Sequence, residues 1–343
     1  MKHSEVLHQL RAARCRVQEI ECDGGGRAAV CALGGRIISL RLPGLDENVF
    51  WSSPEIHKHE VWQKRMWDVA GGIGGVRLWF APEFAYHWTG KPDLVHYSNY
   101  NIPRLTDPGA YRWLPAGKHA VTLTAKPKLR DHRDGSTVSF AVERTIAATA
   151  NPIGARAARY AGVRIQHTLK LLHAKPGQRV DLWHIVQMPP GSRMLIPTHG
   201  RPEPLVYFDE FKRGAWRIGK DCVTWHYTGD QTAKFGLDTG QVTGRAGVLR
   251  RLGNGEWAAL LWQFPVMPGA NYCDGPDARR ARKQISQAWD GFGFGELEYH
   301  SASVGREDPS YAESSLLWCF AGTLQRVNEI AEQLLGRRWN VRG

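Results

Sequence analysis

The clearest indication of the fold is the stretch FGFGELEYH at positions 292–300. It contains a strict alternation in which Glu296, Glu298 and His300 are separated by apolar residues. Residues two apart project to the same face of a β-strand, so this alternation predicts a strand whose polar side chains all point the same way.

Similar short runs follow one another along most of the chain, separated by turn signals that contain glycine or proline. Examples are residues 28–33, 36–42, 121–125, 137–145, 162–171, 180–187, 257–264 and 296–300. With 37 glycines and 19 prolines in 343 residues, this pattern favours many strands joined by turns over a helical protein. It predicts one large, mainly β, antiparallel domain over residues 1–343. Two stacked sandwiches with a boundary near residues 151–152 are the alternative, but no linker composition marks that boundary.

Helical periodicity is found only at the two ends of the chain. Residues 4–14 carry apolar side chains at helical spacing, with Ser4 as the predicted N-cap. Residues 324–335 form a second apolar stripe, which Thr323 can cap and Gly336 can terminate. We therefore expect a short helix at each end.

Charge and cysteine content argue against several classes of protein. The formal net charge is +12, but the basic residues are dispersed, and the densest cluster, residues 279–283, has no interleaved aromatic residues. The charge is therefore only a mild indication of an acidic ligand. The six cysteines form no C-x-x-C pair, and we find no signal peptide and no membrane-spanning run. We expect a soluble cytoplasmic protein without disulfides, with no nucleic-acid partner and no membrane partner.

A glycine-rich segment, residues 71–83, contains the first candidate site. Arg77, Trp79 and Glu83 share a parity in the strand that follows the glycines, so they project to one face. Two charged hydrogen-bonding groups and one aromatic platform suit a polyol ligand. No Gly-Lys-Ser/Thr sequence follows, so a phosphate-binding loop is not indicated. The alternative is an Arg–Glu pair on a solvent-facing strand, with the glycines forming a bulge.

A second candidate strand, residues 181–187, contains His184 among apolar residues. A lone histidine in such a strand is more often a satisfied core residue than a catalyst. Trp183 and Gln187 have the opposite parity, however, so this strand presents polar groups on both faces. That is unusual for a strand that serves only packing.

The strand at 292–300 is the strongest candidate for chemistry. Two carboxylates about 6–7 Å apart, with an imidazole beyond them, would raise one another's pKa if they were enclosed. A general acid or base is tuned toward neutral pH in this way. The alternative is an edge strand with a solvated polar face.

Histidines elsewhere give only a weak metal pattern. His57 and His59 form one His-x-His pair, and His87, His96 and His199 are scattered along the chain. Fourteen histidines produce such a pair by chance, so we predict no metal and no cofactor.

Several of these segments resemble the galactose mutarotase-like, or aldose 1-epimerase-like, superfamily. The runs Gly34-Gly35-Arg36-Ile37-Ile38 and Glu47-Asn48-Val49-Phe50-Trp51 are similar to the opening of aldose 1-epimerase relatives. Segments 71–83 and 296–300 are similar to divergent members of the superfamily. The resemblance extends from about residue 30 to 300 and implies an antiparallel β-supersandwich whose concave sheet binds a sugar.

The resemblance also implies acid–base chemistry. In mutarotases a central-strand His is the general acid at the ring oxygen and a late-strand Glu is the general base. By position, His184 matches the acid, and Glu296 or Glu298 matches the base. The residues expected to bind substrate are Arg77, Trp79, Glu83, His87, Gln187 and His300. The Asn-His segment and the Asn-x-Arg sugar-binding element of mutarotases are not reproduced.

Three functional hypotheses follow for a partner that is a mono- or oligosaccharide. The first is a mutarotase- or epimerase-like isomerase. The second is a lyase or hydrolase that acts on an anionic saccharide, which the net charge and Arg77 motivate. The third is a carbohydrate-binding protein without catalysis.

Overall fold

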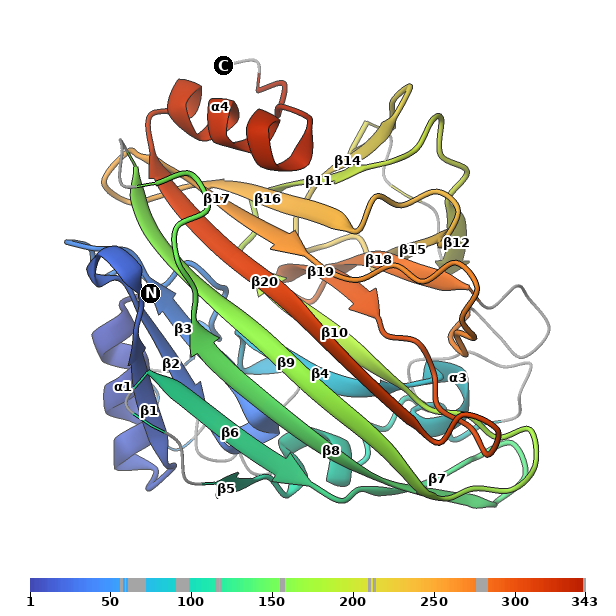
Figure 1. Ribbon diagram of the computed structural model, residues 1–343. Helices are drawn as coiled ribbons and strands as arrows, with labels where there is room; N and C mark the ends of the chain where they lie inside the picture. Colours follow the sequence, from blue (N-terminus) through green and yellow to red (C-terminus); the bar gives the residue numbers. More distant parts are fainter. Residues whose placement is uncertain are drawn as a thin grey trace.

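Two large antiparallel sheets, stacked face to face, form most of the computed structural model (Figure 1). The structure describes residues 1–55, 58, 60, 72–90, 99–114, 117, 119–154, 158–208, 211, 214–275 and 283–341. His57, His59, His96 and most of the basic cluster at 279–283 lie outside the described residues. The arrangement matches the predicted antiparallel β-supersandwich.

The first sheet has nine strands in the described part of the chain. In spatial order they are β1 Val17–Glu21, β2 Arg27–Cys31, β3 Arg36–Arg41, β4 Val76–Ala81, β10 Asp181–Met188, β19 Phe294–His300, β18 Gln284–Gly291, β15 Ala233–Asp238 and β12 Leu205–Phe208. Strands from the beginning, middle and end of the chain are therefore neighbours at the centre of this sheet.

The second sheet has eleven strands in the described part of the chain, ten of them along its main path. In spatial order they are β13 Trp216–Ile218, β14 Cys222–His226, β11 Arg193–Pro197, β16 Arg245–Arg251, β17 Trp257–Gln263, β20 Ser310–Gly322, β9 Arg159–His173, β8 Thr137–Ala148, β6 Ala120–Ala125 and β5 Arg112–Leu114; β7 Lys128–Arg130 pairs with β8. Short helical segments occur in the connections: η1 Asp23–Gly25, η2 Leu33–Gly35, α3 Glu83–Tyr86 and η5 Leu105–Gly109.

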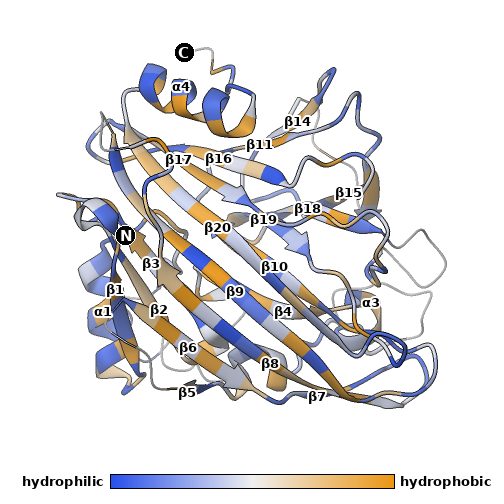
Figure 2. Cartoon of the chain, in the orientation of Figure 1, coloured by the Kyte–Doolittle hydropathy of each residue, from blue (hydrophilic) through white to orange (hydrophobic). Residues whose placement is uncertain are grey.

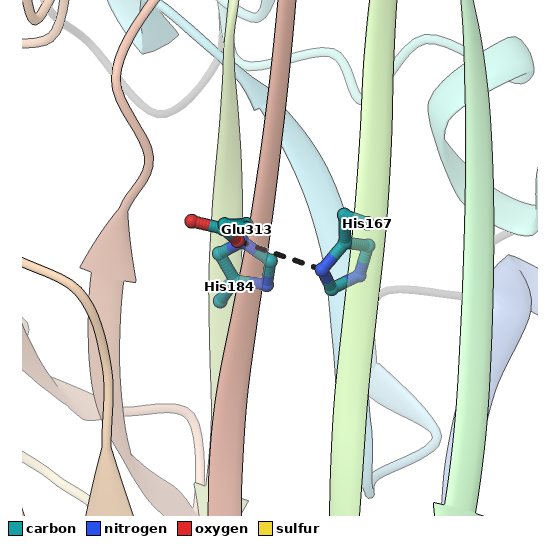
Figure 3. A group of neighbouring side chains, drawn as sticks. All are labelled: His167, His184 and Glu313. Atoms are coloured by element: carbon teal, nitrogen blue, oxygen red, sulfur yellow. Dashed lines mark ion pairs between the residues drawn. The ribbon is translucent and has the colours of Figure 1, made fainter.

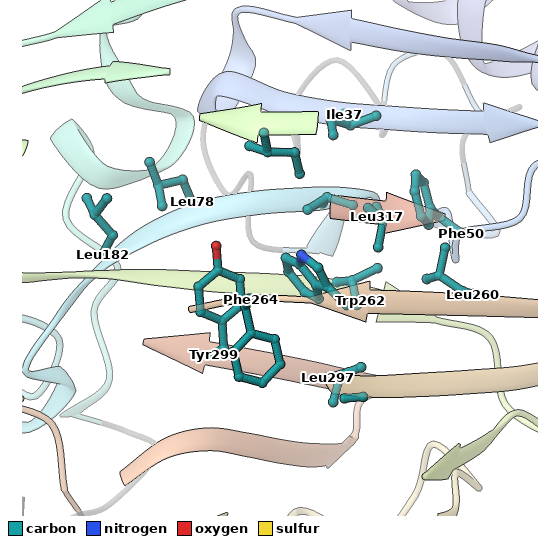
Figure 4. Packing of buried hydrophobic residues seen from close by; sticks show 14 of the residues in the cluster. Ile37, Phe50, Leu78, Leu182, Leu260, Trp262, Phe264, Leu297, Tyr299 and Leu317 are labelled. Atoms are coloured by element: carbon teal, nitrogen blue, oxygen red, sulfur yellow. The ribbon is translucent and has the colours of Figure 1, made fainter. Parts of the chain in front are cut away.

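The main hydrophobic core lies between the two sheets. Apolar and polar side chains alternate along β8 and β9, so each strand buries one face (Figure 2). Phe80 of the first sheet meets Phe140 of the second with ring centroids 4.7 Å apart. Tyr299 of β19 contacts Trp262 of β17 and stacks on Phe264 (Figure 4). In β8 and β9 the alternation therefore corresponds to one buried face, whereas β4, β10, β18 and β19 of the first sheet are buried on both faces.

The C-terminal helix covers part of the outer face of the second sheet. This helix, α4 Leu324–Leu335, packs Val327 and Ile330 on β17 and β20. The Thr323 side chain accepts a hydrogen bond from the Arg326 N–H at 3.2 Å, and Gly336 ends the helix in the left-handed conformation. Both caps agree with the sequence prediction.

The N-terminal helix, α1 His3–Ala12, covers the outer face of β1–β3 (Figure 1). Ser4 is not its N-cap, because the helix begins one residue earlier and Lys2 occupies the capping position. Ser4 instead binds the Asp46 carboxylate through its backbone N–H at 3.0 Å and its hydroxyl at 2.5 Å. None of the helices in the described ranges is both long enough and apolar enough to span a membrane.

Two glycines allow close backbone approaches at the start of β4. Gly74 and Gly75 have φ values of 107° and 83°, in the region that side chains disfavour. A Cβ on Gly74 would lie 2.2 Å from the Trp51 carbonyl oxygen, and one on Gly75 would lie 2.4 Å from that of Ile37. The glycines therefore bring the segment around Trp51 against the central strands, next to the site described below.

Candidate functional site

A cavity of about 590 Å³ opens on the outer face of the first sheet, beyond the strands that α1 covers. Its floor consists of side chains from four strands of this sheet: Arg77 and Trp79 of β4, Trp183 of β10, Glu296 and Glu298 of β19, and Lys234 of β15. Aromatic and aliphatic residues make up most of the rest of the described lining: Trp51, Tyr100, Ile102, Trp289, Phe292 and Phe294. The volume falls within the roughly 300–1,000 Å³ typical of small-molecule sites.

The register of the sheet brings these residues together. Trp183 lies opposite Trp79 on one side and His300 on the other. Four residues further along β10, on the same face, Gln187 lies opposite Glu296. Residues two apart share a face, so the polar side chains of β19 and the aromatic side chains of β4 and β10 converge on the same surface.

Glu296 is held by two donors on the cavity floor. Its Oε1 accepts hydrogen bonds from Arg77 Nη2 at 2.7 Å and from Gln187 Nε2 at 3.0 Å. The Arg77 guanidinium also lies 3.6 Å from the centroid of the Trp79 ring. Burial raises the pKa of Glu296, and the cations of Arg77 and Lys234 oppose that shift.

Glu298 has one oxygen fixed and the other without a partner. Trp183 Nε1 donates to its Oε2 at 2.6 Å, and Lys234 Nζ lies 3.4 Å from the same oxygen. Its Oε1 is buried and has no hydrogen-bond partner in the described part of the chain. Burial raises the pKa of Glu298; Lys234 lowers it and the neighbouring Glu296 raises it. Such a carboxylate is suited to accept a proton from a bound ligand.

Lys234 is a central residue of the floor that the sequence analysis missed. Its Nζ lies 2.9 Å from Glu83 Oε2 and 4.2 Å from the centroid of the Trp183 ring, and the residue is 1% exposed. Burial opposes its charge, but the carboxylates of Glu298 and Glu83 outweigh burial and raise the pKa of Lys234. A lone lysine in the otherwise apolar run AKFGL, residues 233–237, was the available signal.

Two predicted ligand residues lie behind the floor and support it. His300 stacks on Trp183, with ring centroids 5.6 Å apart, and its Nδ1 lies 3.0 Å from Asp181 Oδ1. His87 packs against Trp79 and Trp183 and donates from Nε2 to the Phe80 carbonyl at 3.2 Å. Burial lowers the pKa of His87 to about 3, so this ring is neutral. Neither histidine lines the cavity, unlike Arg77, Trp79 and Glu83.

The structure separates His184 from the predicted site. His184 lies on the inner face of β10, between the sheets, where it stacks on Tyr299 with centroids 4.0 Å apart (Figure 3). Its Nε2 is 2.7 Å from Glu313 Oε1. Burial lowers the pKa of His184 well below the usual range, and the positive charge of Arg144 lowers it further. Grouping His184 with Glu296 and Glu298 was therefore wrong, because neighbouring positions of a strand face opposite ways.

His184, His167 and Glu313 are the one group among the described residues whose metal-ligating atoms lie within 4.8 Å of one another (Figure 3). Two imidazoles and a carboxylate are a donor set used by transition metals. The buried Arg144 guanidinium, however, lowers the pKa of both imidazoles, and the same charge would oppose a divalent cation. We interpret the group as a polar cluster of the core.

This placement gives a testable prediction for His184. His184→Gln should lower the melting temperature, since buried polar contacts are lost, at a cost of about 1–3 kcal/mol. It should leave the affinity for any ligand of the cavity within twofold of the wild type, because the side chain lies on the other face of the sheet. Titration calorimetry at a temperature where the variant is folded measures this, and a tenfold loss of affinity would contradict the placement.

The charges of the cavity argue against the acidic ligand that the net charge suggested. Among its described lining residues, Arg77 and Lys234 are basic. The acidic ones are Glu55, Glu83, Glu296 and Glu298. Both cations already contact carboxylates, so this surface favours a neutral polyol over an anion.

Solved structures provide the comparison. The sequence matches no protein-family model, and no curated protein is similar enough to match it. A protein from Escherichia coli K12, provisionally described as an aldose 1-epimerase, aligns over 90% of this chain and 99% of its own, with a TM-score of 0.53 and 11% identity. A galactose mutarotase-like protein from Lactobacillus casei aligns over 89% of this chain and 100% of its own, with a TM-score of 0.51 and 10% identity. The chain therefore has the β-supersandwich fold of the galactose mutarotase-like proteins.

Proposed function

We propose that this protein binds a neutral sugar in the cavity and catalyses proton transfer at its anomeric centre, as a mutarotase-like isomerase. The observation that most supports this is the Glu298 carboxyl group. One of its oxygens is held by Trp183 and Lys234, while the other has no hydrogen-bond partner among the described residues. Burial raises its pKa, as a general base requires. Proteins of the same fold that are described as aldose 1-epimerases add support.

In the proposed reaction, Glu298 takes the proton of the anomeric hydroxyl as the carbonyl forms at C1. The bond between C1 and the ring oxygen breaks, and the Lys234 ammonium donates a proton to that oxygen. Lys234 Nζ lies 3.4 Å from Oε2 of the same carboxyl group, so the acid and the Oε1 base are close enough to serve two oxygens bound to one carbon atom. After the C1 aldehyde rotates, ring closure on its other face returns both protons and yields the other anomer.

The remaining floor residues suit the body of the sugar. Glu296 and Arg77 present a fixed acceptor and a fixed donor for hydroxyl groups. Trp79 and Trp183 add apolar surface to the floor, with Arg77 and Lys234 lying over their ring faces. The acidic lining argues against a lyase or hydrolase for anionic saccharides.

The experiment that tests this function is an NMR exchange measurement on a panel of neutral aldoses. Glucose, galactose, mannose and xylose are each mixed with catalytic amounts of the protein, and magnetisation exchange between anomers is recorded. We expect faster exchange for at least one of them. Binding in calorimetry without faster exchange would instead identify a carbohydrate-binding protein without catalysis.

The pH dependence of the exchange rate gives a further prediction. A base must be ionised, so the rate should fall as the pH drops through the raised pKa of Glu298. The acidic limb of the rate profile should then lie above the usual range of a glutamate. Glu296→Gln should move this limb to lower pH, because Glu296 is one of the charges that raise the pKa of Glu298. If the acidic limb of the Glu296→Gln profile stays at the pH found for the wild type, a group other than Glu298 is responsible for it.

A further inference from the structure

Four aromatic residues form a platform at one end of the cavity. Trp51 and Phe294 have ring centroids 4.4 Å apart, and Trp289 lies 5.2 Å from Phe294 and 5.3 Å from Phe292. Trp51, Trp289 and Phe294 make up a hydrophobic cluster separate from the main core. This platform adjoins the charged floor within the same cavity.

Phe292 occupies a turn position whose backbone conformation disfavours phenylalanine. It forms, with Gly293, the two-residue turn between β18 and β19, and both have positive φ values, 51° and 87°. Turns of this kind strongly prefer Asn-Gly or Gly-Gly, since other side chains are strained there. Phe292 is also 66% exposed, the most of any large hydrophobic residue in the described part of the chain. Neither backbone preference nor burial therefore explains an aromatic ring here.

The geometry of β19 places the platform beside the floor in a defined order. Phe294, Glu296 and Glu298 share one face of the strand, and residues two apart are about 6.6 Å apart along it. A sugar with its anomeric carbon at Glu298 extends past Glu296. A substituent on its far side then reaches the ring of Phe294.

We propose that the aromatic platform is a second sugar subsite, and that the preferred ligand is a neutral oligosaccharide with a free reducing end. The reducing unit lies on the floor, where its anomeric hydroxyl meets Glu298. The next unit stacks its C–H face on Trp289, Phe292 and Phe294. This inference rests on the proposed function, because the platform extends a site that must already hold a sugar.

The test compares reducing disaccharides with their monosaccharides by titration calorimetry. The probes are maltose, cellobiose, lactose and melibiose against glucose and galactose. We expect one disaccharide to bind at least tenfold more tightly than either monosaccharide. Phe292→Asn should lower the affinity for that disaccharide by about tenfold, which is the contribution of one aromatic contact. It should change the affinity for the monosaccharides less than twofold.

Phe292→Asn is suited to this test because asparagine is favoured in the turn, so its melting temperature should equal or exceed that of the wild type. Leu172→Asn, at an exposed apolar residue of β9 outside the cavity lining, is the matched control and should bind both sugar classes normally. Equal losses for mono- and disaccharide, or no disaccharide preference in the wild type, would overturn the second subsite alone. If neither class binds the wild type, the proposed function fails as well.

Discussion

Glu298→Gln is expected to lower the protein-catalysed rate of anomer exchange by about 10²–10⁴, the usual contribution of a positioned general base. The amide keeps an oxygen that can accept the Trp183 N–H but cannot take up a proton from the sugar. Sugar affinity should change much less than the rate. NMR exchange spectroscopy gives the rate, and calorimetry on the same samples gives the affinity.

Glu143→Gln is the matched control for this variant, because Glu143 is an exposed residue of β8 in the second sheet. Its exchange rate should equal that of the wild type. A Glu298→Gln variant that retains more than a tenth of the wild-type rate would contradict the role of Glu298 as the base.

Lys234→Met is expected to lower the free energy of unfolding by about 3–5 kcal/mol, the typical cost of removing one partner from a buried ion pair. Lys234 contacts Glu83 and Glu298, and all three side chains are 8% exposed or less. Methionine fills similar space but leaves both carboxylates without their common cation. Urea unfolding at neutral pH measures the loss, and Lys170→Met, at an exposed position of β9, should stay within about 0.5 kcal/mol of the wild type.

The destabilisation of Lys234→Met should depend on pH in a defined direction. Lys234 lowers the pKa of Glu83 and of Glu298, so its removal raises both values further above those of the unfolded chain. A carboxyl group with a raised folded-state pKa contributes stability at low pH and loses it as the pH rises through that pKa. The difference in unfolding free energy between the wild type and Lys234→Met should therefore become smaller as the pH falls. A deficit that is constant from neutral to acidic pH would show that lost packing, not charge, causes it.

Much of the site was predictable from strand parity, which is a local property. Glu296 and Glu298 were assigned to one face of a strand, and Arg77 and Trp79 to one face of another, and all four line the cavity. Glu83 also lines it, but from α3, because the strand predicted to carry it ends at Ala81. Turn signals and alternation were also sufficient to predict a mainly antiparallel β protein with a helix at each end of the chain, and the family resemblance implied the supersandwich.

The remaining features depend on long-range register, which the sequence does not display. Strand parity put His184 and Trp183 on opposite faces of the same strand. Only the pairing of β10 with β4 and β19 determines which of the two faces borders the cavity. Lys234 joins the site because β15 and β18 are neighbours, although their sequences are about 50 residues apart. The role suggested for Phe292 depends on a turn whose conformation contradicts local preference.

The most direct test of this account is a crystal structure of the protein with the aldose that exchanges fastest. We expect the pyranose on the floor of the cavity, in contact with Trp79 or Trp183. Its anomeric oxygen should lie within about 2.6–3.2 Å of Glu298 Oε1. A sugar bound elsewhere on the molecule, or bound here with its anomeric carbon directed away from Glu298, would contradict the proposed chemistry.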